Sequence, residues 1–412
     1  MKRGYLSEYF DGVAIKRLSA VEANDTRSNQ HEYNAIRAML DFMGKPSERT
    51  RLDTRFIYLC DDDPEPVLED AFLTLYNARV NQTHRAAEYR FYFPTTAVSQ
   101  LASEGDLLVV ARQRNGSLLV IIAENGSSAA SQVEWLFGFS GEDHPRFSVR
   151  AELENEQDRI GFAATYILES IGIEVAPPSD SFLDMMIGRF GRVFPKTAEF
   201  SAFARGTLDD IDCREAPDVA LLAWMEREEI LFRTLERHLI GDRLAEGFER
   251  DDIDSFIQFS LSVQNRRKSR VGQAFEHHVQ EIFVAHEIRF ARAAITENRA
   301  KPDFLFPGDS EYHNPAFSSL DLTMLGVKST CKDRWRQVLS EADRIEEKHL
   351  LTLETAISPN QTREMQQKRL QLVLPRGLHE TYGMDQKNWL MDVSGFIGLV
   401  KRRQKRVVSS LF

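Results

Sequence analysis

The chain has 412 residues, a formal net charge of −11 at pH 7 and 42% hydrophobic residues. The length predicts two or three domains, and the composition is typical of a soluble globular protein. The acidic balance argues against a protein that coats nucleic acid nonspecifically. No apolar run is long enough to span a bilayer and the first residues have no signal-peptide core, so we expect no membrane partner. Three widely separated cysteines fit a reducing cytoplasm.

The first part of the chain is expected to be mostly strand, because short apolar or alternating runs recur in it. These runs lie at residues 56–60, 72–76, 107–111 and 118–122. Arg114-Asn115-Gly116-Ser117 separates the last two runs, and Asn-Gly tolerates the positive φ of a type I′ hairpin turn. Short helices are expected at 30–43 and 129–138. Together these elements predict a small β-pseudobarrel.

A Pro-Pro step at Pro177-Pro178 cannot continue a helix, and we place a linker around it at 175–185. The linker separates an N-terminal domain, residues 1–174, from a C-terminal domain, residues 186–412. In the second domain we expect helices at 216–239, 271–287 and about 332–347, and strands at 303–306, 323–328 and 370–374. Strands that alternate with helices predict a mixed sheet flanked by helices, so the fold class is α+β or α/β with more than one domain.

A lysine and an aspartate mark the ends of two predicted strands. Asp303 follows a proline and begins the strand 303–306, and Lys328 ends the strand 323–328. An aspartate that begins a buried strand is costly unless a partner pairs with it. If the two strands are neighbours, Asp303 and Lys328 can meet at one end.

Two glutamates fall inside apolar stripes. Glu341 lies within the stripe of the helix expected at 332–347, and Glu276 lies within that of the helix expected at 271–287. A carboxylate in such a position is expected to face another charge or a metal ion rather than bulk water.

Asp303, Lys328, Glu341 and Glu276 can therefore converge. Carboxylate oxygens suit Mg²⁺, which lowers the pKa of a bound water, and a lysine can orient that water or offset charge on the phosphate. This set is the minimum for hydrolysing a phosphodiester. From spacing alone, a buried ion-pair network of Asp303 with Lys328, and Glu341 at an interface, is an equal alternative.

Two basic runs, at 264–270 and 401–406, stand out in an acidic chain. Such runs are more often a solvated surface than a binding site. The first run lies just before Glu276, which favours a role in binding an anionic ligand.

Four segments of the second domain form a further pattern: NRRKSRVG (265–272), AITENRAKPDFLFP (294–307), VKSTCKDRWRQVLSEADRI (327–345) and HLLTLETAIS (349–358). These segments closely resemble the C-terminal domain of the EcoRII-type restriction endonucleases. KRLSAVEANDT (16–26) resembles the family's N-terminal domain more loosely. The resemblance implies a restriction-endonuclease-like core of the PD-(D/E)xK class, in a variant whose second acidic residue lies on a helix.

By position, the resemblance makes Asp303, Lys328 and Glu341 the catalytic set, with Glu276 as a further acidic member. Asp303 and Glu341 would hold the Mg²⁺ cofactor. Because all four residues are present, we expect an active enzyme.

The resemblance also implies how DNA is recognised. Lys332, Asp333 and Arg334 would read G·C pairs in the major groove, since Lys and Arg donate to guanine and Asp accepts from cytosine. The family target is a CC/GG site around a central A·T pair, so the expected site is CCWGG, cut before the first C. The first basic run would hold phosphates through Arg266, Arg267, Lys268 and Arg270.

The family's N-terminal domain resembles the DNA-binding pseudobarrel of plant auxin-response transcription factors, and it clasps a second, effector copy of the site with two loop arms. Residues 77–90 keep the pattern of one arm, and residues 24–31 would form the other. The side chains expected to contact G and C edges are Arg79, Arg85, Glu88 and Arg90. A strand pair with solvated charges is the alternative.

A homodimer through the catalytic domains is implied as well, because two active sites are needed to cut both strands of a palindrome. The resemblance further implies autoinhibition by the N-terminal domain until effector DNA binds. A restriction-modification system would also contain a cognate DNA methyltransferase.

We therefore expect a Mg²⁺-dependent type II (IIE-like) restriction endonuclease that acts on double-stranded DNA in the cytoplasm. Two other classes stay open: a sequence-specific DNA-binding regulator with an inactive nuclease core, and a repair or structure-specific nuclease. Intact Asp303, Lys328 and Glu341 favour the endonuclease over the regulator. The base-reading triplet favours sequence-specific cutting over repair.

Overall fold

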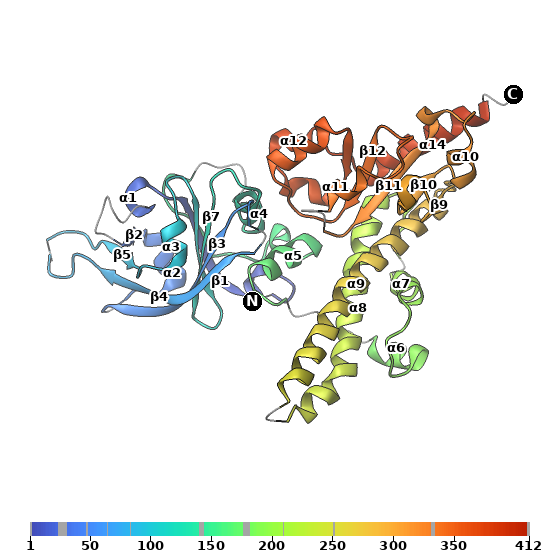
Figure 1. The fold of residues 1–412 in the computed structure, drawn as a ribbon. Helices are drawn as coiled ribbons and strands as arrows, with labels where there is room; N and C mark the ends of the chain where they lie inside the picture. Colours follow the sequence, from blue (N-terminus) through green and yellow to red (C-terminus); the bar gives the residue numbers. More distant parts are fainter. Residues whose placement is uncertain are drawn as a thin grey trace. The chain divides into compact units, whose positions relative to one another are not determined.

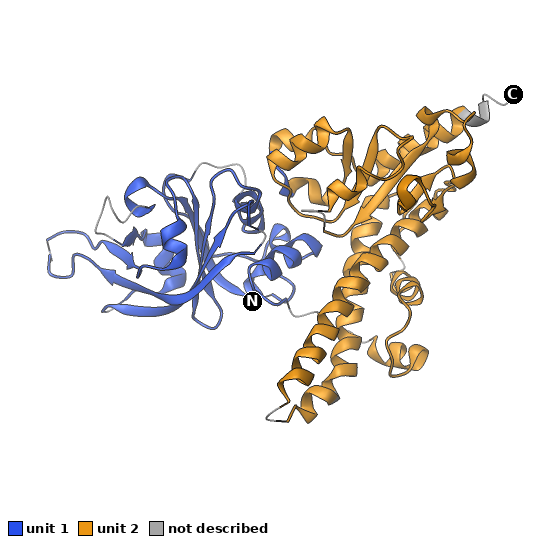
Figure 2. Cartoon of the chain, in the orientation of Figure 1, with its two compact units in different colours: residues 1–175, 381–383 blue, residues 176–380, 384–412 orange. Residues whose placement is uncertain are grey.

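The computed structural model of the chain divides into two compact units (Figures 1 and 2). It describes residues 2–23, 31–46, 48–63, 65–82, 84–139, 144–175, 182–208, 210–249, 252–330 and 334–409. Unit 1 comprises residues 1–175 and 381–383, and unit 2 comprises residues 176–380 and 384–412. None of the described helices is both long and apolar enough to cross a membrane.

Unit 1 is built on a curled sheet of eight strands in the order β2-β5-β4-β3-β7-β6-β1-β8. The strands are β1 (Phe10–Arg17), β2 (Glu32–Asn34), β3 (Thr50–Leu59), β4 (Val67–Asn77), β5 (Tyr89–Tyr92), β6 (Leu107–Gln113), β7 (Leu118–Ala123) and β8 (Ser148–Arg150). Neighbouring strands run antiparallel except for β3 and β7, which are parallel.

The hairpin predicted from Asn-Gly is confirmed, since β6 and β7 pair antiparallel. The predicted type I′ turn is wrong, because Gly116 has a φ of +88° but Asn115 does not have a positive φ; the Gly116 amide closes the turn on the Gln113 carbonyl instead. Both strands are apolar at nearly every position because the sheet is covered on both faces. Val109 and Ile121 belong to one hydrophobic cluster, while Val110 and Val120 belong to another.

The helices of unit 1 are α1 (Ala20–Ala23), α2 (Leu40–Met43), α3 (Ala97–Leu101), α4 (Ser128–Leu136) and α5 (Phe162–Ser170). The helix expected at 129–138 corresponds to α4. The helix expected at 30–43 is largely wrong, because β2 and a 3₁₀ turn precede the single turn of α2. Tyr33 is buried and stacks on Phe93 at 4.4 Å between ring centroids, which favours pairing into the sheet over a helix.

Unit 2 contains a sheet of five strands in the order β13-β12-β11-β10-β9. The strands are β9 (Ala291–Arg292), β10 (Phe304–Phe306), β11 (Thr323–Lys328), β12 (Lys348–Thr352) and β13 (Leu370–Val373). β9, β10 and β11 run antiparallel to one another in turn, whereas β11, β12 and β13 are parallel. The mixed sheet confirms the predicted α+β class.

Helices surround this sheet, and the long pair α8 and α9 packs together as a hairpin (Figure 1). The helices are α6 (Leu183–Phe190), α7 (Thr197–Arg205), α8 (Pro217–Glu246), α9 (Ile253–Ala285), α10 (Asp309–His313), α11 (Trp335–Val338), α12 (Pro359–Gln367), α13 (Met384–Lys387) and α14 (Val393–Ser409). α9 also contacts β11, which brings the helix of Glu276 against the strand of Lys328.

The helix expected at 332–347 is wrong beyond its first turn. α11 ends at Val338, and the chain then makes turns until β12 begins at Lys348. The apolar stripe was correctly expected to be buried, since Trp335, Val338, Ala342 and Ile345 are all at most 2% exposed. Ala342 has a φ of +51°, which an α-helix does not allow.

Gly326 allows α11 to lie close against β11. A Cβ atom at this position would lie 2.9 Å from Cγ2 of Val338, closer than real Cβ contacts. The absence of a side chain therefore sets how near the segment after β11 approaches the strand.

Candidate active site

Asp303 and Lys328 meet at one end of the β10–β11 pair. The antiparallel register places Phe304 opposite Leu325, so Asp303 lies beside the end of β11, as expected for neighbouring strands. Lys328 Nζ donates to Asp303 Oδ2 at 2.8 Å, and the Val327 amide donates to the same oxygen at 2.6 Å. The side chains of Asp303 and Lys328 are 17% and 23% exposed, so the pair is half-shielded but accessible.

Glu341 faces this pair from the turns that follow α11. Burial, and next the negative charge of Asp303, raise the pKa of the Glu341 carboxyl to about 7, while Lys328 acts in the opposite direction. Its Oε2 atom is buried and makes no hydrogen bond to any described residue. A carboxylate oxygen in this state is expected to bind a cation or a donor.

Glu276 approaches from α9. Burial raises the pKa of its carboxyl, and the charge of Asp303 raises it further. Arg292, on β9, pairs with Glu276 and also donates from Nη1 to Gln280 Oε1 at 2.7 Å. Arg292 holds Glu276 in place and was not predicted from the sequence, where nothing connects a two-residue strand with α9.

The four candidate residues therefore interact electrostatically across two strands, one loop and one helix. Three carboxylates, those of Asp303, Glu276 and Glu341, lie near three cations, Lys328, Arg292 and Lys348. The unpartnered Oε2 of Glu341, beside the carboxylate of Asp303, fits a divalent cation. Among the described residues, no group of three or more acidic, histidine or cysteine side chains lies close enough together to hold a metal ion by itself. Mg²⁺ does not require one, because it keeps several waters and takes one or two carboxylates.

Of the three residues predicted to read base edges, Arg334 is exposed immediately before α11. Lys332 and Asp333 lie outside the described residues. Trp335 follows and is fully buried, so it fixes the start of α11 in the core.

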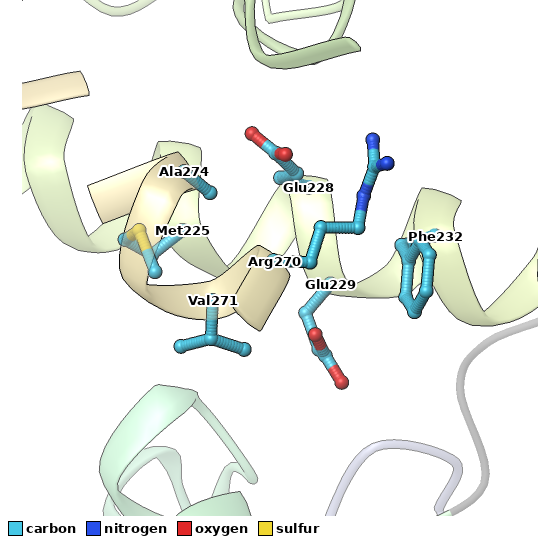
Figure 3. A pocket seen from close by; sticks show the side chains of 7 residues that line it. All are labelled: Met225, Glu228, Glu229, Phe232, Arg270, Val271 and Ala274. Atoms are coloured by element: carbon cyan, nitrogen blue, oxygen red, sulfur yellow. The ribbon is translucent and has the colours of Figure 1, made fainter. Parts of the chain in front are cut away.

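Most of the predicted phosphate contacts are engaged inside unit 2. Arg270 is 7% exposed, donates to the Pro195 carbonyl at 3.1 Å, and lies among Glu228, Glu229 and Phe232 of α8 (Figure 3). Burial lowers the pKa of its guanidinium. The remaining members of the run differ: Arg267 donates to Glu236 Oε2 at 2.7 Å, Arg266 lies 4.1 Å from the ring centre of Phe194, and Lys268 is exposed.

In unit 1 the predicted base-reading side chains form a chain of ion pairs. Arg90 binds Glu32 Oε2 at 2.7 Å and Glu88 Oε1 at 2.5 Å, and Arg79 pairs with Glu88 as well. The hydrogen bond from Arg90 lowers the pKa of the Glu88 carboxyl. Arg85 donates to Gln82 Oε1 at 3.3 Å. The second arm, at 24–31, lies outside the described residues except for His31.

The comparisons with known proteins relate the chain to restriction enzymes. Residues 232–397 match the family model described as EcoRII C terminal. Over 240 residues the chain is 38% identical to the type II restriction enzyme EcoRII of Escherichia coli, a stretch that covers 57% of each chain. The chain therefore matches only 57% of the length of this curated relative.

Two solved structures are similar in part. Metal-depleted Ecl18kI in complex with uncleaved DNA has a TM-score of 0.44 and 16% identity, covering 55% of this chain and 84% of that chain. The restriction endonuclease PspGI–substrate DNA complex has a TM-score of 0.42 and 15% identity, covering 52% of this chain and 94% of that chain.

Proposed function

We propose that the chain, whose residues 232–397 match the family model described as EcoRII C terminal, is a type II restriction endonuclease. It hydrolyses phosphodiester bonds of double-stranded DNA at a short palindromic site. The observation that carries the proposal is the meeting of Asp303, Lys328 and Glu341 near the end of β11, with the buried Oε2 of Glu341 left without a hydrogen-bond partner among the described residues. A buried ion-pair network would be expected to partner each carboxylate oxygen.

Asp303 and Glu341 are the proposed ligands of Mg²⁺. When bound, the ion supplies a water of lowered pKa and offsets negative charge on the phosphate. Lys328 keeps its ammonium beside Asp303 at 2.8 Å, where it orients the attacking water or neutralises the phosphate. Glu276, held by Arg292, adds negative charge on the α9 side.

We assign sequence recognition to the segment between β11 and α11. Lys332, Asp333 and Arg334 would contact G·C pairs of a CCWGG site, and the exposed position of Arg334 supports access to DNA. The exposed Lys268 is the member of the first basic run best placed to reach a phosphate, whereas Arg266, Arg267 and Arg270 support the helix that carries it.

The N-terminal domain would bind a second, effector copy of the site through Arg79, Arg85, Glu88 and Arg90. Arg90 exchanges its carboxylate partners for guanine acceptors when DNA binds. Until then the domain would inhibit cleavage. Two chains would act as a homodimer on the palindrome, and a cognate DNA methyltransferase would protect the host site.

The test is to incubate the full chain with Mg²⁺ and a plasmid that carries two or more CCWGG sites. Discrete fragments with ends at those sites support the proposal. An intact plasmid points to a DNA-binding regulator, and site-independent nicking points to a structure-specific nuclease. A plasmid without CCWGG sites and an Asp303→Asn variant are the matched controls, and both should leave the DNA uncut.

A further inference from the structure

Lys348 is a buried lysine whose hydrogen bonds, among the described residues, all go to backbone carbonyls. It is the first residue of β12 and is 7% exposed. Its ammonium donates to the carbonyl oxygens of Glu341 at 2.5 Å, Ala342 at 3.0 Å and Ile345 at 3.0 Å. Three acceptors use all three of its protons. Burying an ammonium is costly, so an apolar residue would be expected at this position unless the contacts serve a purpose.

These carbonyls belong to residues 341–345, which we name the carboxylate loop. Because the loop is not helical, its buried carbonyl and amide groups need partners from elsewhere. The Ala342 amide donates to Thr296 Oγ1 at 3.3 Å, and the Asp343 amide donates to Glu297 Oε2 at 3.1 Å. Lys348 supplies donors on the carbonyl side, so the loop is held from both sides.

The same contacts fix the backbone of Glu341 and leave its side chain available. The carbonyl of Glu341 is bound by Lys348, whereas its Oε2 atom has no hydrogen-bond partner among the described residues. A carboxylate that is rigid at its backbone and unsatisfied at its tip is preorganised for a cation, because little freedom is lost on binding.

Lys348 acts from a distance. In the parallel pair of β11 and β12, Lys328 aligns with Thr352, four residues along the strand from Lys348. Four residues of parallel strand span roughly 13 Å. Lys348 therefore lies at the opposite end of the strand pair from the proposed reaction site. Its positive charge lowers the pKa of the Glu341 carboxyl, and its hydrogen bonds reach the site through the carboxylate loop.

We propose that Lys348 is a positioning residue that holds Glu341 in place to bind the metal ion, and that it sets the affinity of the site for the ion. This inference rests on the proposed function, since it assumes that Glu341 is a metal ligand. Loss of groups that orient a metal ligand typically weakens metal binding about 10- to 100-fold.

The test compares Lys348→Met and Lys348→Arg with Arg403→Met, in the full chain. Methionine keeps the stem of Lys348 and removes all three donors, and arginine keeps the charge without being able to converge on three carbonyls. Arg403 is the control, because it also binds oxygens in unit 2, at Leu322, Thr323 and Glu347, and none of these residues belongs to the carboxylate loop.

The readouts are Mn²⁺ affinity by calorimetric titration, amide hydrogen exchange over residues 341–345, and melting temperature. Lys348→Met should raise the half-saturating Mn²⁺ concentration about 10-fold or more and speed exchange in the loop, and Lys348→Arg should raise that concentration several-fold. Arg403→Met should lower the melting temperature and leave Mn²⁺ affinity unchanged. A Lys348→Met protein that is folded and binds Mn²⁺ with wild-type affinity overturns the proposal. If that variant does not fold, the same criterion applies to Lys348→Arg.

Plasmid cleavage by the unaltered chain separates this inference from the proposed function. A wild-type chain that cuts DNA, while the Lys348 variants keep wild-type Mn²⁺ affinity, overturns the positioning role alone. A wild-type chain that neither cuts nor binds Mn²⁺ overturns both.

Discussion

Two clusters of charge, one in each unit, differ in how their carboxylates are balanced. In unit 1, Arg90 binds Glu32 and Glu88, and its hydrogen bond lowers the pKa of the Glu88 carboxyl. In unit 2, burial and the neighbouring charge of Asp303 raise the pKa values of Glu276 and Glu341.

The difference indicates which kind of ligand each cluster is suited to bind. A balanced cluster of arginines and glutamates is stable as it stands and can exchange its partners for base edges that offer both acceptors and donors. A cluster in which burial raises the pKa values of two carboxyl groups and leaves one carboxylate oxygen unpartnered favours a divalent cation.

The largest effect is expected for Lys328→Ala in unit 2. Lys328 is the cation bound directly to Asp303, at 2.8 Å. Removing a charge that stabilises the transition state should slow cleavage by roughly 10³-fold or more. Binding of CCWGG DNA should be retained, because Lys328 does not supply base recognition. Cleavage rates with Mg²⁺ and gel-shift titrations check both parts, and a variant that cuts at near the wild-type rate refutes the assigned chemistry.

In unit 1, Arg90→Ala should weaken binding of effector DNA by about 10- to 100-fold, the discrimination that one bidentate arginine contact provides. Arg55→Ala is the matched control, since Arg55 forms a similar two-bond pair with Asp70 on the same unit but is far more exposed. Titration of a CCWGG duplex against chains that also carry Asp303→Asn measures binding without cleavage. Equal losses for Arg90→Ala and Arg55→Ala would contradict a specific role for Arg90.

Glu341→Gln should stabilise the protein at high pH. Burial, and secondly the charge of Asp303, raise the pKa of Glu341 from 4.5 to about 7, so its ionised form opposes folding. This cost is absent below the ordinary pKa and complete above pH 7. The variant should therefore gain about 1–2 kcal/mol at pH 8, allowing for solvent screening, and nothing near pH 4. Chemical denaturation at the two pH values measures the difference.

Glu88→Gln should change the stability of the protein in the opposite direction to Glu341→Gln. Arg90 lowers the pKa of Glu88, so the ionised carboxylate adds stability that is present above its ordinary pKa and is lost as the pH falls through the lowered value. The variant should lose a little stability at pH 8. If Glu341→Gln and Glu88→Gln shift stability in the same direction at pH 8, the contrast between the clusters fails.

The smallest effect is expected for Lys268→Ala. Lys268 is exposed, whereas Arg267 and Arg270 beside it bind groups inside unit 2. Loss of one phosphate contact should reduce the slope of log affinity against log salt by about one, with little change in site preference. Affinities for CCWGG and unrelated duplexes, measured over a range of NaCl concentrations, check this. An unchanged slope would show that Lys268 does not contact a DNA phosphate.

The sequence was most informative where a charge interrupts an apolar strand. Asp303 precedes one buried apolar strand and Lys328 ends the next, and the pairing of these neighbouring strands brings the two side chains together. The burial of Glu341 also followed from its apolar neighbours. The backbone conformation around Glu341 did not follow from the sequence, because apolar residues spaced three and four apart are compatible with buried turns as well as with a helix.

Other features depend on contacts that spacing does not encode. Arg270 lies in a basic run that suggests a surface, yet the packing of α8 against α9 buries it. Lys348 gives the same signal as Lys328, a charge at the end of an apolar strand. Lys348 could therefore have been identified from the sequence. The helix expected to run through residue 347 led us to miss the strand β12, which begins at Lys348.

The most direct test of the central claim is a crystal structure of the full chain with Mn²⁺, located by its anomalous scattering. We expect a peak in contact with carboxylate oxygens of both Asp303 and Glu341, and we expect Asp303→Asn to abolish it. A saturated crystal with no peak there, or with Asp303 and Glu341 too far apart to share one ion, would contradict it.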